Sequence, residues 1–339
     1  MATQVLERID ITAVSIRNYR DGDQKLLADM INETDQVDRF DRRTTVDDLQ
    51  HEWEDPHFTP AKDGFVAVVG QDGAQRVVAA GDVYLGAPNV AAEQITVYNW
   101  HVVRPEWRGS GVGRQIIQAC YGRARELVAD IADPRPKVFR VSAHAADAHA
   151  RRRLKQFGME HVRTFYTMEY APLDESLPAP DAPPGLSIVP WTPAYDRATM
   201  DTFNESFRDH WGFRNVSPEE WQHWFHDPKS RPDLWRIALD DATGEVAGIC
   251  IVGIDPDTNE ALGRQEGWVH DLGVRRPWRK RGLGTALLLA GMAVLREAGM
   301  TSARLGVDSD SLTDATRIYE RVGYRVVSEW HTYHKSIER

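Results

Sequence analysis

The sequence predicts a mixed α/β protein made of two tandem copies of one domain, each with a mostly antiparallel, twisted sheet flanked by helices. A short signal, Arg-x-x-Gly-x-Gly, occurs at 108–113 and again at 279–284. Each occurrence follows an apolar run typical of a strand and opens a segment with helical periodicity. The chain of 339 residues has room for two domains of about 150 residues, each able to bury a core.

The repeat extends beyond the two glycine signals at a nearly constant interval. The first strands begin at Ser15 and Ser187, and Gly158 corresponds to Gly323 near the end of each copy. The two halves therefore share one order of elements.

A proline-rich segment, 171–185, separates the two copies. Because proline removes a backbone donor and disfavours helix, we expect a semi-rigid linker there. The expected domains are 14–170 and 186–339.

Periodicity and turn signals predict the elements of each copy in order. A turn at 240–244 joins a hairpin, and Gly299 is typical of the residue that ends a helix. In the second copy we expect strands at 186–190, 235–239, 245–254, 267–274, 303–307 and 324–334, and helices from about 194 to 226, 282 to 298 and 312 to 321. In the first copy we expect a hairpin at 64–84, strands at 95–103, 137–142 and 160–169, and helices at 112–130 and 147–156.

The strand, glycine turn and helix start together predict a site for a pyrophosphate. Free N–H groups and the helix dipole face the anion, and the glycines let the backbone approach it closely. A glycine turn alone fits many phosphate sites. Neither turn has the Gly-x-x-x-x-Gly-Lys-Ser/Thr pattern, which disfavours a nucleotide or phosphoryl-transfer enzyme.

Composition excludes several other classes. A formal net charge of −10 argues against non-specific binding to nucleic acid or an anionic membrane. The two cysteines, Cys120 and Cys250, do not form a zinc-ligand pattern with the histidines, so no metal is expected. The N-terminus lacks a signal-peptide core, and the longest apolar run, 285–295, is too short to span a bilayer. We expect a cytoplasmic protein.

Three features of the second copy together resemble the GNAT superfamily of acyl-CoA-dependent N-acetyltransferases. Residues 272–284 match the strand, turn and pyrophosphate loop of that family, and a helix follows. Residues 315–324 match its closing signature, Ala-x-x-x-Tyr-Glu-x-x-Gly-aromatic. The first copy repeats most of these features, so the chain resembles the tandem two-domain members of the family.

The resemblance implies an acyl-CoA co-substrate, acetyl-CoA or another, and a different role for each copy. In the family, the tyrosine at the position of Tyr319 donates a proton to the departing thiolate, and the first copy has Leu154 there. We therefore expect the C-terminal copy to be catalytic and the N-terminal copy to be structural or regulatory. Because the first copy keeps its glycine turn, CoA binding there stays open.

The implied cofactor site consists of the strand end and the glycine turn. The strand would pair with the pantetheine arm as an added strand does, and the turn would hold the pyrophosphate. A solvated basic turn is the alternative. The implied residues are Leu272, Gly273, Val274, Arg279, Lys280, Arg281, Gly282, Leu283, Gly284, Thr285 and Ser311 in the second copy, and Val103, Arg108, Gly109, Ser110, Gly111, Val112 and Gly113 in the first.

Attack by an amine also needs a base, and three side chains on the strand before the turn are candidates: His270, Asp271 and Glu266. Regular alternation would place His270 and Asp271 on opposite faces. Histidine suits neutral pH best. The alternative roles are a packed, hydrogen-bonded histidine and, for Tyr319, a core tyrosine.

Two segments bear on the acceptor. Residues 203–225 are rich in aromatic side chains, which suits either a pocket for a flat or apolar acceptor or ordinary core packing. Residues 21–55 are rich in Asp and Glu, which suits a solvated helix face or the attraction of a polycationic acceptor.

The sequence thus favours an N-acyltransferase that acts on a primary amine of a small molecule. Neither motif contains a cysteine, so direct attack in a ternary complex is expected in place of an acyl-enzyme. The alternative is a catalytically silent acyl-CoA-binding sensor or scaffold, which need not keep Tyr319. Both a monomer and a homodimer remain compatible with the sequence.

Overall fold

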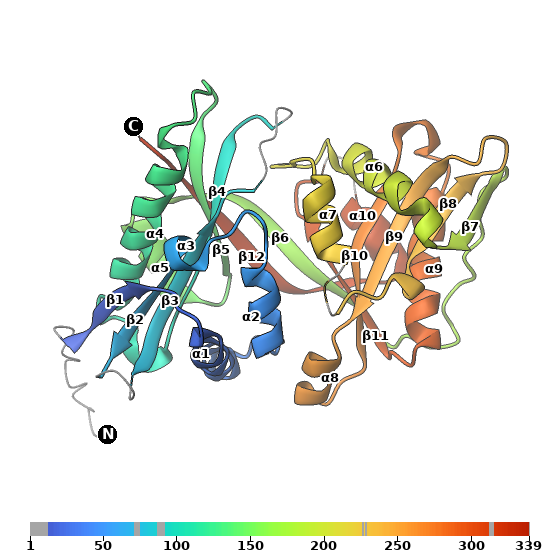
Figure 1. Ribbon diagram of the computed structural model, residues 1–339. Helices are drawn as coiled ribbons and strands as arrows, with labels where there is room; N and C mark the ends of the chain where they lie inside the picture. The colour runs from blue at the N-terminus through green and yellow to red at the C-terminus, as the bar shows by residue number, and fades with distance from the viewer. Residues whose placement is uncertain are drawn as a thin grey trace. The chain divides into compact units, whose positions relative to one another are not determined.

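The computed structural model describes residues 13–70, 75–86, 92–225, 227, 229–311 and 315–338. The chain divides into two compact units (Figure 1). Unit 1 is drawn from Met1–Gly86, Glu93–Val162 and His331–Arg339, and unit 2 is formed mainly by Arg163–Trp330.

Unit 1 contains a sheet with the strand order β1-β2-β3-β4-β5-β12. Its elements are β1 (Ser15–Asn18), α1 (Asp23–Asp38), α2 (Val46–Trp53), α3 (Pro60–Asp63), β2 (Gly64–Val69), β3 (Arg76–Tyr84), β4 (Ile95–Val103), α4 (Val112–Ala129), β5 (Lys137–His144), α5 (Ala148–Gln156) and the end of β12 (Arg325–Ser336). The first five strands run antiparallel to their neighbours except for the parallel pair β4–β5. Along β2, Val66 and Val68 join the apolar cluster of α1 and α2, whereas Ala67 joins that of α4 and α5. The sheet is therefore buried on both faces.

Unit 2 repeats this arrangement with the order β7-β8-β9-β10-β11-β6. Its elements are β6 (Glu160–Tyr170), β7 (Leu186–Pro190), α6 (Asp196–Phe207), α7 (Pro218–Phe225), β8 (Arg236–Asp240), β9 (Val246–Ile254), α8 (Pro256–Leu262), β10 (Glu266–Val274), α9 (Leu283–Glu297), β11 (Ser302–Asp308) and α10 (Ala315–Val322). Among the neighbouring strands of this sheet, as far as the structure describes them, only β10 and β11 run parallel. One apolar cluster includes side chains of α6 and α7, and a second, on the other face, includes those of α9 and α10.

The closing strands of the two sequence halves are exchanged. β6 follows α5 along the chain, yet it pairs antiparallel with β11, from Tyr170 opposite Ala303 to Phe165 opposite Asp308. β12 follows α10, yet its end lies along β5, where the hydroxyls of Ser142 and Thr332 are 2.9 Å apart.

Each exchanged strand contributes to the core of the sheet that it completes. The Met168 side chain of β6 is fully buried in the cluster of α9 and α10. The Tyr333 side chain of β12 is 1% exposed in the cluster of α4 and α5. The compact units therefore differ from the contiguous halves 14–170 and 186–339.

The proline-rich segment 171–185 lies within unit 2. Leu173 and Leu177 are buried in the cluster of α9 and α10, and the N–H of Leu173 donates to the carbonyl of Thr301 at 2.7 Å. The segment thus contributes to a core, which its composition did not indicate.

The predicted mixed α/β class is confirmed, and most elements begin and end within a few residues of their expected bounds. Helix α8 is an exception, because no helix was expected between β9 and β10. Its start is capped by the Asp255 carboxylate, which accepts from the N–H of Thr258 at 3.0 Å, and Gly263 ends it in a left-handed conformation.

The strand exchange predicts which of the two units a core substitution in β6 or β12 destabilises. Met168→Ala should destabilise unit 2 by about 2–5 kcal/mol and speed amide exchange in β11, while β5 is unaffected. Tyr333→Ala should instead destabilise unit 1 and speed amide exchange in β5, while β11 is unaffected. Hydrogen-exchange mass spectrometry measures the amide exchange rates of β5 and β11 in each variant. Val326→Ala, at a side chain 46% exposed on β12, serves as the control. Faster exchange of β5 in Met168→Ala would contradict the exchanged arrangement.

Candidate active site

Strand β10 leaves its parallel neighbour halfway along its length. Pairing with β11 runs from Glu266 opposite Ser302 to Val269 opposite Leu305 and stops there. β10 nevertheless stays paired with β9 as far as Val274, and β11 stays paired with β6. Past Val269 the two strands are thus held by different partners. The edge of β10 over 272–274, the segment expected to contact pantetheine, therefore has no strand partner on the side of β11.

A β-bulge at His270 marks the point of divergence. Val269 lies opposite Val252, but the next paired residue of β10 is Asp271, opposite Ile251. The extra residue breaks the alternation of the strand. His270 and Asp271 therefore line the same cavity, so the expectation that they point to opposite faces is wrong. His270 lies over Gly253, where a Cβ would be 2.6 Å from its Nε2 atom.

The cavity beside the bulge has a volume of about 390 Å³. Its walls combine tryptophan rings with charged and polar groups. Besides His270 and Asp271, its lining includes Trp221, Trp235, Trp268, Asp227, Asp255, Lys229 and Arg231. The aromatic segment 203–225 contributes to the core, because Phe203 and Trp221 belong to the core cluster of this face, and Trp221 also lines the cavity.

The two side chains at the bulge titrate differently. Burial raises the pKa of Asp271 to about 7, so its carboxyl changes protonation near neutral pH. Burial lowers the pKa of His270, an effect that Asp227 opposes. Asp271 is therefore the better matched of the two to accept a proton at neutral pH.

Glu266, the third candidate base, belongs to a separate ion-pair cluster. Its carboxylate lies 2.9 Å from Nε of Arg304 and 3.2 Å from a guanidinium nitrogen of Arg264, and the indole of Trp268 donates to it at 3.1 Å. It lines another recess together with these arginines. The structure therefore does not bring Glu266 together with His270 and Asp271, which line the cavity beside the bulge.

The glycine turn of unit 2 leads into the first turn of α9. Lys280 and Gly282 adopt left-handed conformations, with φ of 61° and 88°. No side chain caps the helix, and its N–H groups at 283–285 have no intrahelical acceptor. Among the described residues, a Cβ on Gly284 would have only Val274 within 4 Å, at 3.8 Å, so there is room for an added atom at this position. Thr285 follows in the same turn, and buried Leu283 anchors it.

Arg279 is the exception within this turn, because internal contacts hold its guanidinium. It donates to the carbonyls of Val274 and Ser206 at 2.9 and 3.0 Å and pairs with Asp209 at 3.1 Å. In unit 1, Arg108 pairs with Asp38 in the same way, at 2.7 Å. Both arginines thus fasten the first long helix of their unit to the turn, in place of the expected free charge for a phosphate.

The sequence carried a signal for this ion pair that was missed. Asp38 and Asp209 are separated by the same interval as the two arginines. Lys280 and Arg281 remain exposed beside the start of α9, and Arg281 donates to the carbonyl of Pro184 at 2.9 Å. These two side chains supply the positive charge next to the turn.

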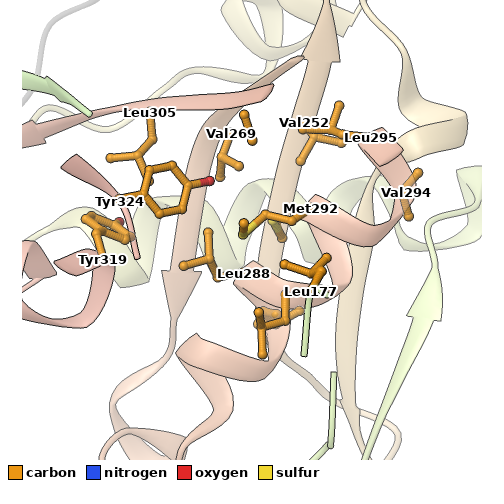
Figure 2. Close-up of a cluster of buried hydrophobic side chains, with 14 of the residues drawn as sticks. Leu177, Val252, Val269, Leu288, Met292, Val294, Leu295, Leu305, Tyr319 and Tyr324 are labelled. Atoms are coloured by element: carbon orange, nitrogen blue, oxygen red, sulfur yellow. The ribbon is translucent and has the colours of Figure 1, made fainter. Parts of the chain in front are cut away.

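Tyr319 lies on α10, within the cluster that also contains Leu288 and Met292 (Figure 2). It is 9% exposed, and its ring centre is 6.0 Å from that of Tyr324. Burial, with Cys250 and Asp271 nearby, raises the pKa of Tyr319, so the phenol stays protonated at neutral pH and can donate. Tyr319 and Asp271 lie on opposite faces of the sheet, Tyr319 in the cluster of α9 and α10 and Asp271 in the cavity that Trp221 also lines.

The remaining expected residues are placed as follows. Ser311 lies in the loop after β11, where its N–H donates to the carbonyl of Asp308 at 3.2 Å. In unit 1, Gly109 and Gly111 have φ of 81° and 106°, Ser110 donates to the carbonyl of Trp107 at 2.7 Å, and α4 begins at Val112. Leu154, at the position that matches Tyr319, is fully buried. Gly113 and Val103 are also buried, and a Cβ on Gly113 would lie 2.9 Å from Val103.

Within the described part of the chain, no helix is long and apolar enough to cross a membrane. The same residues contain no cluster of three or more His, Cys, Asp or Glu side chains arranged to hold a metal ion.

Comparisons with known proteins agree with this geometry. The sequence model of the acetyltransferase (GNAT) family matches residues 197–324, from α6 to just beyond α10. A mycothiol acetyltransferase of Thermobispora bispora is 32% identical over 229 residues, covering 66% of this chain and 70% of that protein.

Solved structures extend the likeness to nearly the whole chain. A GCN5-related N-acetyltransferase from Sphaerobacter thermophilus, 25% identical, aligns over 96% of both chains with a TM-score of 0.73. A tandem GNAT protein from the clavulanic acid biosynthesis pathway, 18% identical, shares the fold, with a TM-score of 0.66 over 96% of this chain and 99% of that one. The chain therefore belongs to the GNAT family of acetyltransferases, in its tandem form, and is an acetyl-CoA-dependent acyltransferase.

Proposed function

We propose that unit 2 transfers an acetyl or other acyl group from acyl-CoA to the primary amine of a small molecule, by direct attack in a ternary complex. One observation carries this proposal. The edge of β10 over 272–274 has no partner from β11, the glycine turn after it leads into an uncapped helix start, and a protonated phenol and a carboxyl with a pKa of about 7 lie on opposite faces of the sheet.

In this proposal, the N–H groups at the start of α9 hold the pyrophosphate, with Lys280 and Arg281 adding charge. The pantetheine arm lies along 272–274, as an added strand would. A backbone N–H of this segment donates to the thioester carbonyl and stabilises the negative charge that develops there during attack.

Asp271 takes a proton from the acceptor's ammonium group, directly or through water, so that the neutral amine attacks the thioester carbonyl, and His270 lies beside Asp271 as the second candidate base. When the tetrahedral intermediate collapses, the C–S bond breaks and Tyr319 donates a hydrogen bond or proton to the leaving thiolate. Neither cysteine suits an acyl-enzyme route, because both are buried and burial raises the pKa of Cys250 to about 12.

The acceptor would enter from the cavity beside the bulge. Its tryptophan rings suit the body of a compact molecule, and Asp227 and Asp271 suit an ammonium group. The likeness to mycothiol acetyltransferase supports a small-molecule acceptor.

Removal of the Tyr319 hydroxyl tests whether this side chain donates to the leaving thiolate. Tyr319→Phe should lower kcat about 100-fold or more, since a positioned acid contributes on that order, while the Kd for CoA stays near the wild-type value. Release of free thiol measures turnover, and calorimetry measures CoA binding. Tyr324→Phe is the matched control, because this hydroxyl lies in the same cluster and lacks a hydrogen-bond partner among the described residues. Equal turnover of Tyr319→Phe and wild type would remove Tyr319 from the mechanism.

The pH dependence of kcat/KM tests whether Asp271 is the general base. Since Asp271 must be ionised to accept a proton, kcat/KM should rise with pH and level off above an apparent pKa of about 7. Asp271→Asn should remove this limb and lower kcat/KM about 100-fold. His270→Asn should keep the limb. If the limb instead survives in Asp271→Asn and is lost in His270→Asn, the histidine is the base.

A charge at the start of α9 tests the pyrophosphate site. Gly284→Asp has room for its Cβ, and an acidic residue in the first turn stabilises a helix. Its carboxylate would repel the phosphates and weaken CoA binding about tenfold or more, with no loss of thermal stability. Gly284→Ala separates the effect of charge from that of size. Undiminished CoA affinity of Gly284→Asp would place the pyrophosphate elsewhere.

A further inference from the structure

The first turn of α4 in unit 1 is covered by a side chain from α5. Arg153 extends from α5 across this turn, so that a Cβ on Gly113 would lie 3.0 Å from its Cδ atom and 3.3 Å from its Nε. The same Nε donates to Nε2 of His101 on β4, at 3.2 Å. The arginine thus bridges the start of α4 and the strand before the glycine turn.

The hydrogen bond to His101 persists over the physiological pH range. Burial, and secondly the charge of Arg153, hold the pKa of His101 well below its usual value. The imidazole therefore stays neutral and keeps Nε2 available as an acceptor.

Unit 2 is open at the corresponding place. The repeat matches Gly113 with Gly284 and Arg153 with Ile318. In the part of the chain that the structure describes, a Cβ on Gly284 would have only Val274 within 4 Å, at 3.8 Å, and no side chain of α10 lies as close to it as Arg153 lies to Gly113. The two glycine turns share their left-handed backbone but differ in what covers them.

In unit 1, the parallel strands β4 and β5 stay paired for one residue more than β10 and β11 do in unit 2. β4 pairs with β5 as far as Asn99 opposite Val141, one position beyond the counterpart of Val269 in β10. β4 pairs with β3 in unbroken register from Val103 to Tyr98, without the bulge that opens unit 2.

We propose that Arg153 closes unit 1 to acyl-CoA, so that each chain binds a single acyl-CoA, in unit 2. The inference rests on the proposed pyrophosphate site at the start of α9, because it assumes that the same place in unit 1 would otherwise be used. Unit 1 then acts as a scaffold that completes its sheet with β12, and its retained glycines serve the fold.

The stoichiometry of CoA binding tests the proposal. Calorimetric titration of the full chain with CoA should give one equivalent of bound CoA per chain for wild type and two for Arg153→Ile. This substitution introduces the residue type that unit 2 has at the matching position, Ile318. Arg152→Ile, at an exposed neighbouring arginine, is the matched control and should keep one equivalent. The double variant Arg153→Ile/Gly284→Asp should return to one equivalent at high affinity. Two equivalents for wild type, or one for a folded Arg153→Ile, would overturn the proposal.

Hydrogen exchange of the wild-type chain gives a readout that needs no variant. Acetyl-CoA should slow exchange at 283–287 and leave 112–116 unchanged. Protection at 112–116 would overturn the closure of unit 1. Absence of protection at both helix starts would instead overturn the proposed function, so the two failures are distinguishable.

Discussion

The site of unit 2 depends on the residue at which β10 and β11 stop pairing. A parallel pair that continued past Val269 would satisfy the backbone of β10 with β11 and leave no edge for a ligand. β11 instead continues with β6, and β10 continues with β9 alone. The bulge at His270 accompanies this divergence and turns two titratable side chains toward one cavity. The unpaired edge of β10 and the cavity shared by His270 and Asp271 thus have a common structural origin.

The sequence predicted the features that depend on local chemistry. The periodicity of 282–298 and the glycines before it gave the start of α9, because a left-handed residue and an apolar stripe are both local signals. The signature around Tyr319 likewise placed a helix where α10 lies.

Features that depend on pairing between distant strands were not predictable. The interval between the repeats is the same whether β6 closes its own sheet or the other one, so the exchange leaves no trace in the spacing. The bulge at His270 exists only relative to β9, and a single strand read by alternation places His270 and Asp271 on opposite faces. The roles of Arg279 and Arg153 depend on partners far away along the chain.

The exchange of β6 and β12 has a bearing on how such a chain can arise. Two identical single-copy proteins that trade their last strands form a symmetric dimer, and each would leave an unpaired strand edge if separated. Joining the two genes through a segment such as 171–185 preserves that pairing and removes the requirement that both copies stay identical. One copy is then free to have a leucine where the other has Tyr319 and an arginine beside its glycine turn, while its last strand still completes the sheet of its neighbour.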